Sequence, residues 1–144
     1  PMELARTYGV DAVRYFLMRE VSFGQDGSYS DEAIVTRVNA ELANSFGNLA
    51  QRTFSMIVKN LDGVLPAAGK AGDDEALLAK VAEAEAEARA RFADLDFSVG
   101  LDAWMGAVFA ANAYVDAQAP WTLRKTDPAR MAEVLGTLAH VVER

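Results

Sequence analysis

The longest regular pattern of apolar side chains in the chain runs from Ser30 to Leu61. Apolar residues recur there at steps of three and four positions, which is the period of an amphipathic helix. They are Ala33, Ile34, Val38, Leu42, Leu49, Phe54, Met56, Ile57 and Leu61. Ser30 suits the N-cap position, and Gly47 is the one weak point, at roughly 1 kcal/mol relative to alanine. We therefore expect a single helix roughly 48 Å long.

One face of this predicted helix is polar over three turns. The residues on it are Asn44, Asn48, Gln51, Arg52 and Ser55. Asn48 and Arg52 are four positions apart, so their side chains project from the same face. An amide offers donors and acceptors together, and a guanidinium offers a rigid fork of donors. The pair suits a base edge or a phosphate, although an ordinary solvated helix face has the same spacing.

Helical patterns continue on both sides of this segment. Residues 1–8 predict a short helix ended by Gly9, and a second helix starts at Asp11. Its apolar residues predict a core-facing side made of Val13, Phe16, Leu17 and Val21. Residues 62–72 predict a surface connection. Residues 73–94 predict a further helix whose charged residues form a solvated face.

The last third of the chain predicts two more helices. Residues 97–119 have helical spacing, with Leu101, Met105, Val108, Phe109 and Tyr114 toward a core. Pro120 should end this helix, because proline disfavours helical geometry in the residue before it. A final helix should be capped by Asp127, with Pro128 at its first position. We find no convincing strand, so the expected fold is an all-α bundle of four to five main helices.

Trp121 follows the break at Pro120 and precedes two basic residues, Arg124 and Lys125. An exposed aromatic ring is a stacking surface for an unpaired base, and basic neighbours suit phosphates. The same residues also fit a tryptophan that closes the end of a bundle.

Composition narrows the classes of function. With 144 residues, of which 51% are hydrophobic, the chain suits one domain with a substantial core. It has no cysteine, which excludes disulfides and thiolate sites, and its single histidine, His140, excludes a multi-histidine metal site, so we expect no metal. No apolar run reaches about 18 residues and the first residues are no signal peptide, so we expect no membrane partner and a cytoplasmic location.

The net charge of −7 argues against nucleic acid at first sight, but the charges are unevenly distributed. Residues 1–72 carry 7 basic and 8 acidic side chains, whereas residues 73–144 carry 7 basic and 13 acidic ones. Between Leu42 and Leu61 there are two basic residues, Arg52 and Lys59, and no acid. A local basic site is therefore compatible with an acidic body.

Catalytic motifs are missing from the sequence. It contains no phosphate-binding loop, no dinucleotide fingerprint and no Ser–His–Asp set. We expect no catalytic residue and no cofactor in this chain.

Three stretches together resemble the C-terminal part of the bacterial methionyl-tRNA synthetases, which are class I aminoacyl-tRNA synthetases. They are YGVDAVRYFLMREVSFGQDGSYSDE, NAELANSFGNLAQR and NAYVDAQAPW. The resemblance covers nearly the whole chain and is weakest at residues 62–95.

The resemblance implies a division of the chain into two parts. Residues 1–29 correspond to the end of the stem-contact segment, and residues 30–144 to the α-helical domain that binds the anticodon. In the family, an asparagine, an arginine and a tryptophan after a proline read the CAU anticodon. The matching residues here are Asn48, Arg52 and Trp121, after Pro120, with Asn44, Gln51, Arg124 and Lys125 as supporting candidates.

The family also implies what lies outside this chain. Its catalytic domain activates methionine with ATP and Mg²⁺, in some members beside a zinc-binding insert, and the HIGH-like and KMSKS motifs of that domain are absent from this sequence. The implied partners are the anticodon stem-loop of tRNA(Met) and the enzyme's own catalytic domain. The alternatives are a helical bundle that binds a protein partner and a bundle of purely structural use.

Overall fold

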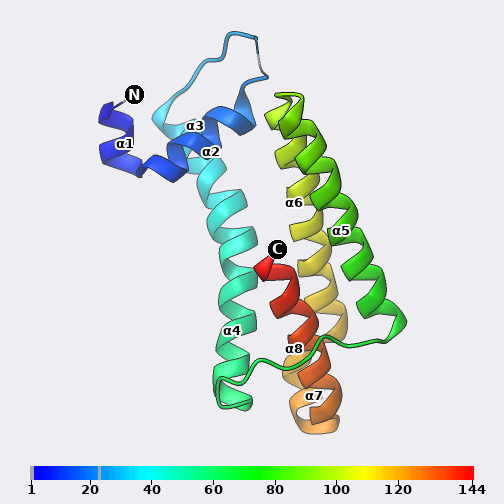
Figure 1. Cartoon of the computed structure of the whole chain (residues 1–144). Coiled ribbons are helices and arrows are strands. Elements are labelled where there is room, and N and C mark those ends of the chain that lie inside the picture. The colour runs from blue at the N-terminus through cyan, green and yellow to red at the C-terminus, as the bar shows by residue number, and fades with distance from the viewer. Residues whose placement is uncertain (1, 23) are drawn as a thin grey trace.

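The computed structural model describes residues 2–22 and 24–144, and all regular secondary structure in these residues is helical. The elements are α1 (Met2–Tyr8), α2 (Val10–Glu20), α3 (Asp31–Arg37), the π-helical segment η1 (Val38–Gly47), α4 (Asn48–Asn60), α5 (Gly72–Ala93), α6 (Phe97–Gln118), α7 (Pro120–Thr126) and α8 (Pro128–Glu143). Helices α4, α5, α6 and α8 lie side by side, with α1 to α3 at one end of the bundle and α7 at the other (Figure 1). The predicted all-α bundle is confirmed.

The segment expected as one helix is a continuous rod made of α3, η1 and α4. Ser30 caps it as predicted, since its Oγ accepts a hydrogen bond from the backbone N of Ala33 at 3.1 Å. The π-helical stretch in its middle was not predicted. There the Oγ of Ser45 donates to the carbonyl of Ala40, five residues earlier, at 2.8 Å. Such π-helical turns are frequent at functional sites. This one lies directly before Asn48 and Arg52 on α4.

The core lies between α4, α5, α6 and α8. Its buried side chains include Leu49, Leu77, Val81, Met105, Val108, Ala111, Val115, Val134 and Leu138. Three predicted members of apolar faces are instead exposed: Leu17 by 47%, Phe54 by 40% and Phe109 by 55%. On α4 the buried stripe runs through Leu49, Thr53 and Ile57 at four-residue steps, which leaves Phe54 beside the stripe.

Glu41, in η1, connects this segment to α2 and α3. It is buried and accepts hydrogen bonds from the Tyr15 hydroxyl at 2.5 Å, from Arg19 at 3.3 Å and from Arg37 at 3.0 Å. Burial by itself raises the pKa of Glu41, but the hydrogen bonds from Tyr15 and Arg37 outweigh it and lower the pKa below its usual value. Arg19 also pairs with Asp102 of α6 at 2.7 Å, so this cluster fixes α2 against both η1 and α6.

Candidate nucleic-acid interface

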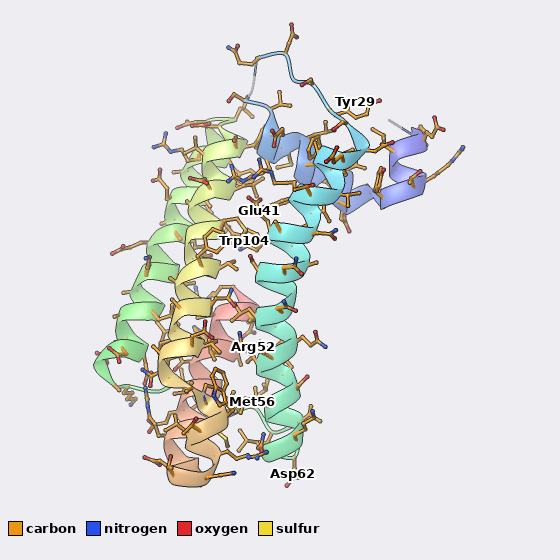
Figure 2. All side chains as sticks on the ribbon, turned by 180° about the vertical axis from the view of Figure 1, so that it is seen from behind. Tyr29, Glu41, Arg52, Met56, Asp62 and Trp104 are labelled. Carbon is orange, nitrogen blue, oxygen red and sulfur yellow. The ribbon has the colours of Figure 1, made fainter. Side chains whose placement is uncertain are left out.

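Asn48 and Arg52 occupy successive turns of α4, and both are exposed. The Nδ2 of Asn48 donates to the carbonyl of Asn44 at 3.1 Å, which orients the amide along the helix. Its Oδ1 has no hydrogen-bond partner among residues 2–22 and 24–144, so an acceptor faces solvent there. The predicted shared face is therefore confirmed. Arg52 and Met56 follow Glu41 down the same rod (Figure 2).

Trp121 is positioned by the break between α6 and α7. Helix α6 ends at Gln118, and Ala119 adopts a left-handed conformation with φ 44°. Pro120 then starts α7 and is buried, whereas Trp121 remains 46% exposed. Pro120 thus anchors the start of α7 in the bundle and leaves a large aromatic ring at the surface.

The fold brings Arg52 and Trp121 together. The guanidinium carbon of Arg52 lies 5.4 Å from the centroid of the Trp121 ring, which is within the range of a cation–π contact. Because Asn48 lies one turn from Arg52 on the same face, an amide, a guanidinium and an indole ring border one region of the surface. The spacing of residues along the chain does not predict that these residues of α4 and α7 lie in contact.

A fourth residue, Asp116, contacts this group and was not predicted from the sequence. Nη2 of Arg52 donates to Oδ1 of Asp116, on α6, at 3.1 Å, and both side chains are largely exposed. Asp116 lies five positions before Trp121, but nothing in its local sequence distinguishes it from other surface acids. Only the packing of α6 beside α4 identifies it.

A pocket of about 400 Å³ opens beside Arg52 and Trp121. Its lining residues come from α4, α6, α7 and α8: Gln51, Arg52, Thr53, Ser55, Met56, Val115, Pro120, Trp121, Leu135 and Leu138. Gln51, one of the supporting candidates, therefore lines this pocket. Thr53 is buried, and its hydroxyl has no hydrogen-bond partner within the described residues.

Arg124 and Lys125 lie in the last turn of α7. Both are exposed, and neither forms an ion pair with any residue that the structure describes. Their charges are available to an anion that approaches α7, although neither side chain lines the pocket.

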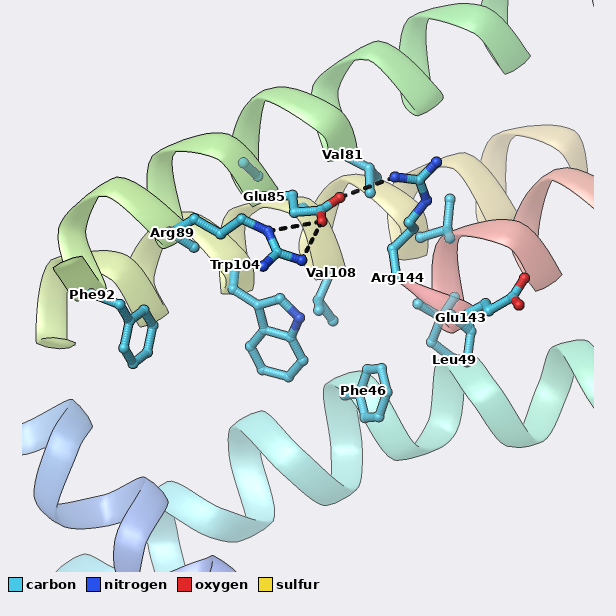
Figure 3. A pocket seen from close by; sticks show the side chains of 15 residues that line it. Phe46, Leu49, Val81, Glu85, Arg89, Phe92, Trp104, Val108, Glu143 and Arg144 are labelled. Carbon is cyan, nitrogen blue, oxygen red and sulfur yellow. Dashed lines mark hydrogen bonds and ion pairs between the residues drawn. The ribbon is translucent and has the colours of Figure 1, made fainter.

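A larger pocket, of about 770 Å³, lies elsewhere in the bundle and shares no lining residue with the first. Figure 3 shows its aromatic residues Phe46, Phe92 and Trp104, and the rings of Phe46 and Trp104 are 5.3 Å apart. At its edge Glu85 pairs with Arg89, one turn along α5, at 2.8 Å and with Arg144, after α8, at 3.2 Å. Apart from Glu85, Arg89, Glu143 and Arg144 its lining residues are apolar, so this pocket is a weaker candidate for binding a polar ligand.

The described residues form neither a metal-binding cluster nor a membrane-spanning helix. No group of three or more histidine, cysteine, aspartate or glutamate side chains in residues 2–22 and 24–144 is arranged to hold a metal ion. Across the same ranges, no helix combines the length and apolar character that spanning a bilayer requires.

Solved structures of relatives have the same fold as this chain. The crystal structure of the free form of Mycobacterium tuberculosis methionyl-tRNA synthetase matches 99% of this chain, and 30% of its own, with a TM-score of 0.94 and 50% identity. The same enzyme in complex with methionyl-adenylate matches equally well, with a TM-score of 0.94.

Sequence comparisons agree with the structural ones. The model of the class I tRNA synthetases (M) matches residues 1–54. The methionine–tRNA ligase of Brucella suis biovar 1 is 52% identical over 145 residues, which cover 100% of this chain, and that of M. tuberculosis H37Rv is 49% identical over 147 residues. The chain spans about 28% of the length of these relatives. Along its whole length, the chain thus belongs to the methionine–tRNA ligase family of class I tRNA synthetases.

Proposed function

We propose that this chain is the part of a methionine–tRNA ligase that binds the anticodon stem-loop of tRNA(Met) and reads its CAU anticodon. The observation that carries the proposal is the position of Arg52 over the Trp121 ring, one helical turn from Asn48. Single-stranded RNA is recognised by stacking unpaired bases on aromatic rings and by hydrogen bonds to base edges. The three side chains supply both kinds of contact.

The donors and acceptors of this site favour cytosine as one of the bases. The pairing edge of cytosine has one amino donor beside two acceptors. The free Oδ1 of Asn48 matches the amino group, and the guanidinium of Arg52 matches the acceptors. Uracil has a carbonyl in place of the amino group and an N–H in place of the neighbouring ring acceptor, so it would leave Asn48 facing another acceptor.

The charges around the site support binding to RNA despite the acidic chain. Arg124 and Lys125 stand without ion-pair partners among the described residues on α7, the helix that carries Trp121. Contacts of these cations with phosphates would position the loop without reading its sequence. Binding should therefore weaken as the salt concentration rises.

The rest of the assignment follows from the family. We propose that residues 1–29 end the stem-contact segment and that residues 30–144 form the anticodon-binding domain. Methionine activation with ATP and Mg²⁺ would belong to a catalytic domain outside this sequence, acting in the cytoplasm. On this proposal the chain alone forms no methionyl-adenylate, and its partners are tRNA(Met) and that catalytic domain.

The test is binding of the chain to RNA hairpins that carry CAU or UAU in the loop. Trp121→Ala should weaken binding to CAU by about 1–3 kcal/mol through the loss of a stacking surface. Arg52→Ala should weaken it as well, and Asn48→Ala should reduce the preference for CAU over UAU more than the affinity. Arg91→Ala, which removes a partly exposed cation from α5, is the control for charge.

Wild-type affinity and preference in all three variants would show that the site is wrongly assigned. If the chain bound neither hairpin but associated with a helical peptide or protein, the alternative of a protein-interaction module would replace the proposal.

A further inference from the structure

Trp121 follows a turn in an uncommon backbone conformation. Ala119, directly before α7, has φ 44° and ψ 61°, in the left-handed region that residues other than glycine rarely adopt. A residue keeps this conformation only where the surrounding structure fixes it. Because Pro120 begins α7 at the next position, the direction of α7, and with it the placement of the Trp121 ring, depends on this turn.

Gln118, the residue before the turn, is bound through both polar atoms of its side chain. Its Nε2 donates to Oδ2 of Asp73 at 3.0 Å, and its Oε1 accepts a hydrogen bond from Nη2 of Arg130 at 3.0 Å. Asp73 lies in the first turn of α5, and Arg130 lies in the first turn of α8. The end of α6 is therefore tied to two other helices directly before the turn.

Arg130 is itself firmly held. Its Nη1 and Nη2 donate to the two carboxylate oxygens of Asp74 at 2.6 and 2.7 Å. Asp74 is fully buried and also accepts hydrogen bonds from the Tyr114 hydroxyl and from the backbone N of Ala71. A charged pair with two parallel hydrogen bonds has a fixed geometry, so Arg130 is a rigid anchor for Gln118.

The same arginine holds the other end of α7. Its backbone N donates to Oδ1 of Asp127, the N-cap residue of α8, at 3.0 Å. The seven residues of α7 thus lie between Gln118 and Arg130, which are hydrogen-bonded to each other. This arrangement leaves α7 little freedom to rotate against the bundle.

We infer that Gln118 and Arg130 are positioning residues for Trp121, and that their hydrogen bond fixes α7 at the angle that holds the Trp121 ring against Arg52. The consequence for RNA rests on the proposed function, but the placement of the ring belongs to the free protein. Gln118 allows the sharper test, because the Asp74–Arg130 pair remains when the Gln118 amide is removed.

The test uses Gln118→Met, which keeps the length of the side chain and removes both hydrogen bonds. In a Trp104→Phe background, Trp121 is the only tryptophan and its emission reports its surroundings. We expect a red-shifted emission that is quenched more readily by acrylamide, an unchanged helical content, and CAU-hairpin affinity lower by about tenfold, as for the loss of one stacked base. Glu133→Gln is the control, since it alters another contact of Arg130, at 3.1 Å, away from the turn.

A double variant tests the hydrogen bonds themselves. Gln118→Glu with Asp73→Asn places an acceptor before Arg130 and a donor at residue 73, so it should restore both the emission and the affinity.

Different results would overturn the positioning role of Gln118 and Arg130 and the proposed binding of RNA. Wild-type emission and quenching in Gln118→Met would overturn the positioning role, whatever the RNA does. A shifted emission together with unchanged hairpin binding in Trp121→Ala would support the positioning role and overturn the proposed function instead.

Discussion

The guanidinium of Arg52 lies 5.4 Å from the centre of the Trp121 ring and at the same time donates to Asp116 at 3.1 Å. A base that stacks on Trp121 and pairs with Arg52 competes with Asp116 for the same donors. If the site binds RNA as proposed, Asp116 imposes a cost on every base that pairs with Arg52, and a base that uses all the donors of the guanidinium offsets that cost best.

We therefore expect Asp116→Asn to strengthen binding to hairpins in general and to reduce the preference for CAU. An exposed ion pair is worth up to about 1 kcal/mol, so the gain in affinity should not exceed about fivefold. Asp102→Asn removes the same charge from the other end of α6 and should leave the preference unchanged. An equal gain in both variants would indicate a general effect of net charge, contrary to this prediction.

The sequence predicted the helices well because their signals are local. The Ser30 cap, the break at Pro120 and the start of α8 after Asp127 all depend on residues a few positions apart. The four-residue spacing that places Asn48 and Arg52 on one face is a local signal too. The grouping of these residues with Trp121 came from the family resemblance.

Features that depend on the packing of distant segments were not predicted. The acids of α5 were expected on a solvated face, which is wrong for Asp74, because Arg130 of α8 neutralises it in the interior. The pairing of Asp116 with Arg52 likewise joins residues 64 positions apart. The π-helical stretch has the same apolar pattern as an α-helix over its length, so periodicity did not distinguish the two.

Two buried threonines should respond in opposite ways to the loss of a hydroxyl. Thr53 has a hydroxyl without a partner among the described residues, whereas Thr137 Oγ1 accepts from the backbone N of Gly69 at 2.9 Å and donates to the carbonyl of Glu133 at 3.0 Å. Burying an unpaired polar group costs about 1–3 kcal/mol. Thr53→Val should therefore raise the free energy of unfolding in urea by about 1 kcal/mol, and Thr137→Val should lower it by about 1–3 kcal/mol.

Each variant is the control for the other, because both replace a threonine hydroxyl by a methyl group inside a helix. Destabilisation of similar size in both would show that the Thr53 hydroxyl is satisfied in solution.

At Gly136 the backbone of the connection 61–71 passes close to α8. A Cβ at this position would lie 2.1 Å from the carbonyl oxygen of Ala67, which is backbone and cannot rotate away. Gly136→Ala should therefore lower the free energy of unfolding by about 1–3 kcal/mol, despite the higher helix propensity of alanine. Gly106→Ala, in α6, meets no atom within 4 Å and should instead stabilise the fold by about 0.5–1 kcal/mol.

Equal unfolding midpoints for the two alanine variants would mean that the connection shifts freely away from α8. Urea denaturation followed by circular dichroism measures both.

The buried Asp74 should make the fold sensitive to acid. The hydrogen bond from Arg130 lowers the pKa of Asp74 below 3.8, its ordinary value, and so below its value in the unfolded chain. Above about pH 5 the carboxylate is ionised in both states, and its full contribution to stability is present. As the pH falls below 3.8, the unfolded chain takes up a proton first, so this contribution decreases until the folded pKa is passed.

Asp74→Asn should accordingly unfold more easily than the wild type at pH 7, since it leaves Arg130 without its ionised partner. Its free energy of unfolding should also fall less steeply between about pH 5 and pH 2, because the titrating group is gone. Glu75→Gln, which removes an exposed carboxylate from the same turn of α5, is the control for net charge. Urea unfolding at a series of pH values measures both effects, and parallel pH profiles for Asp74→Asn and the wild type would show that another group governs acid unfolding.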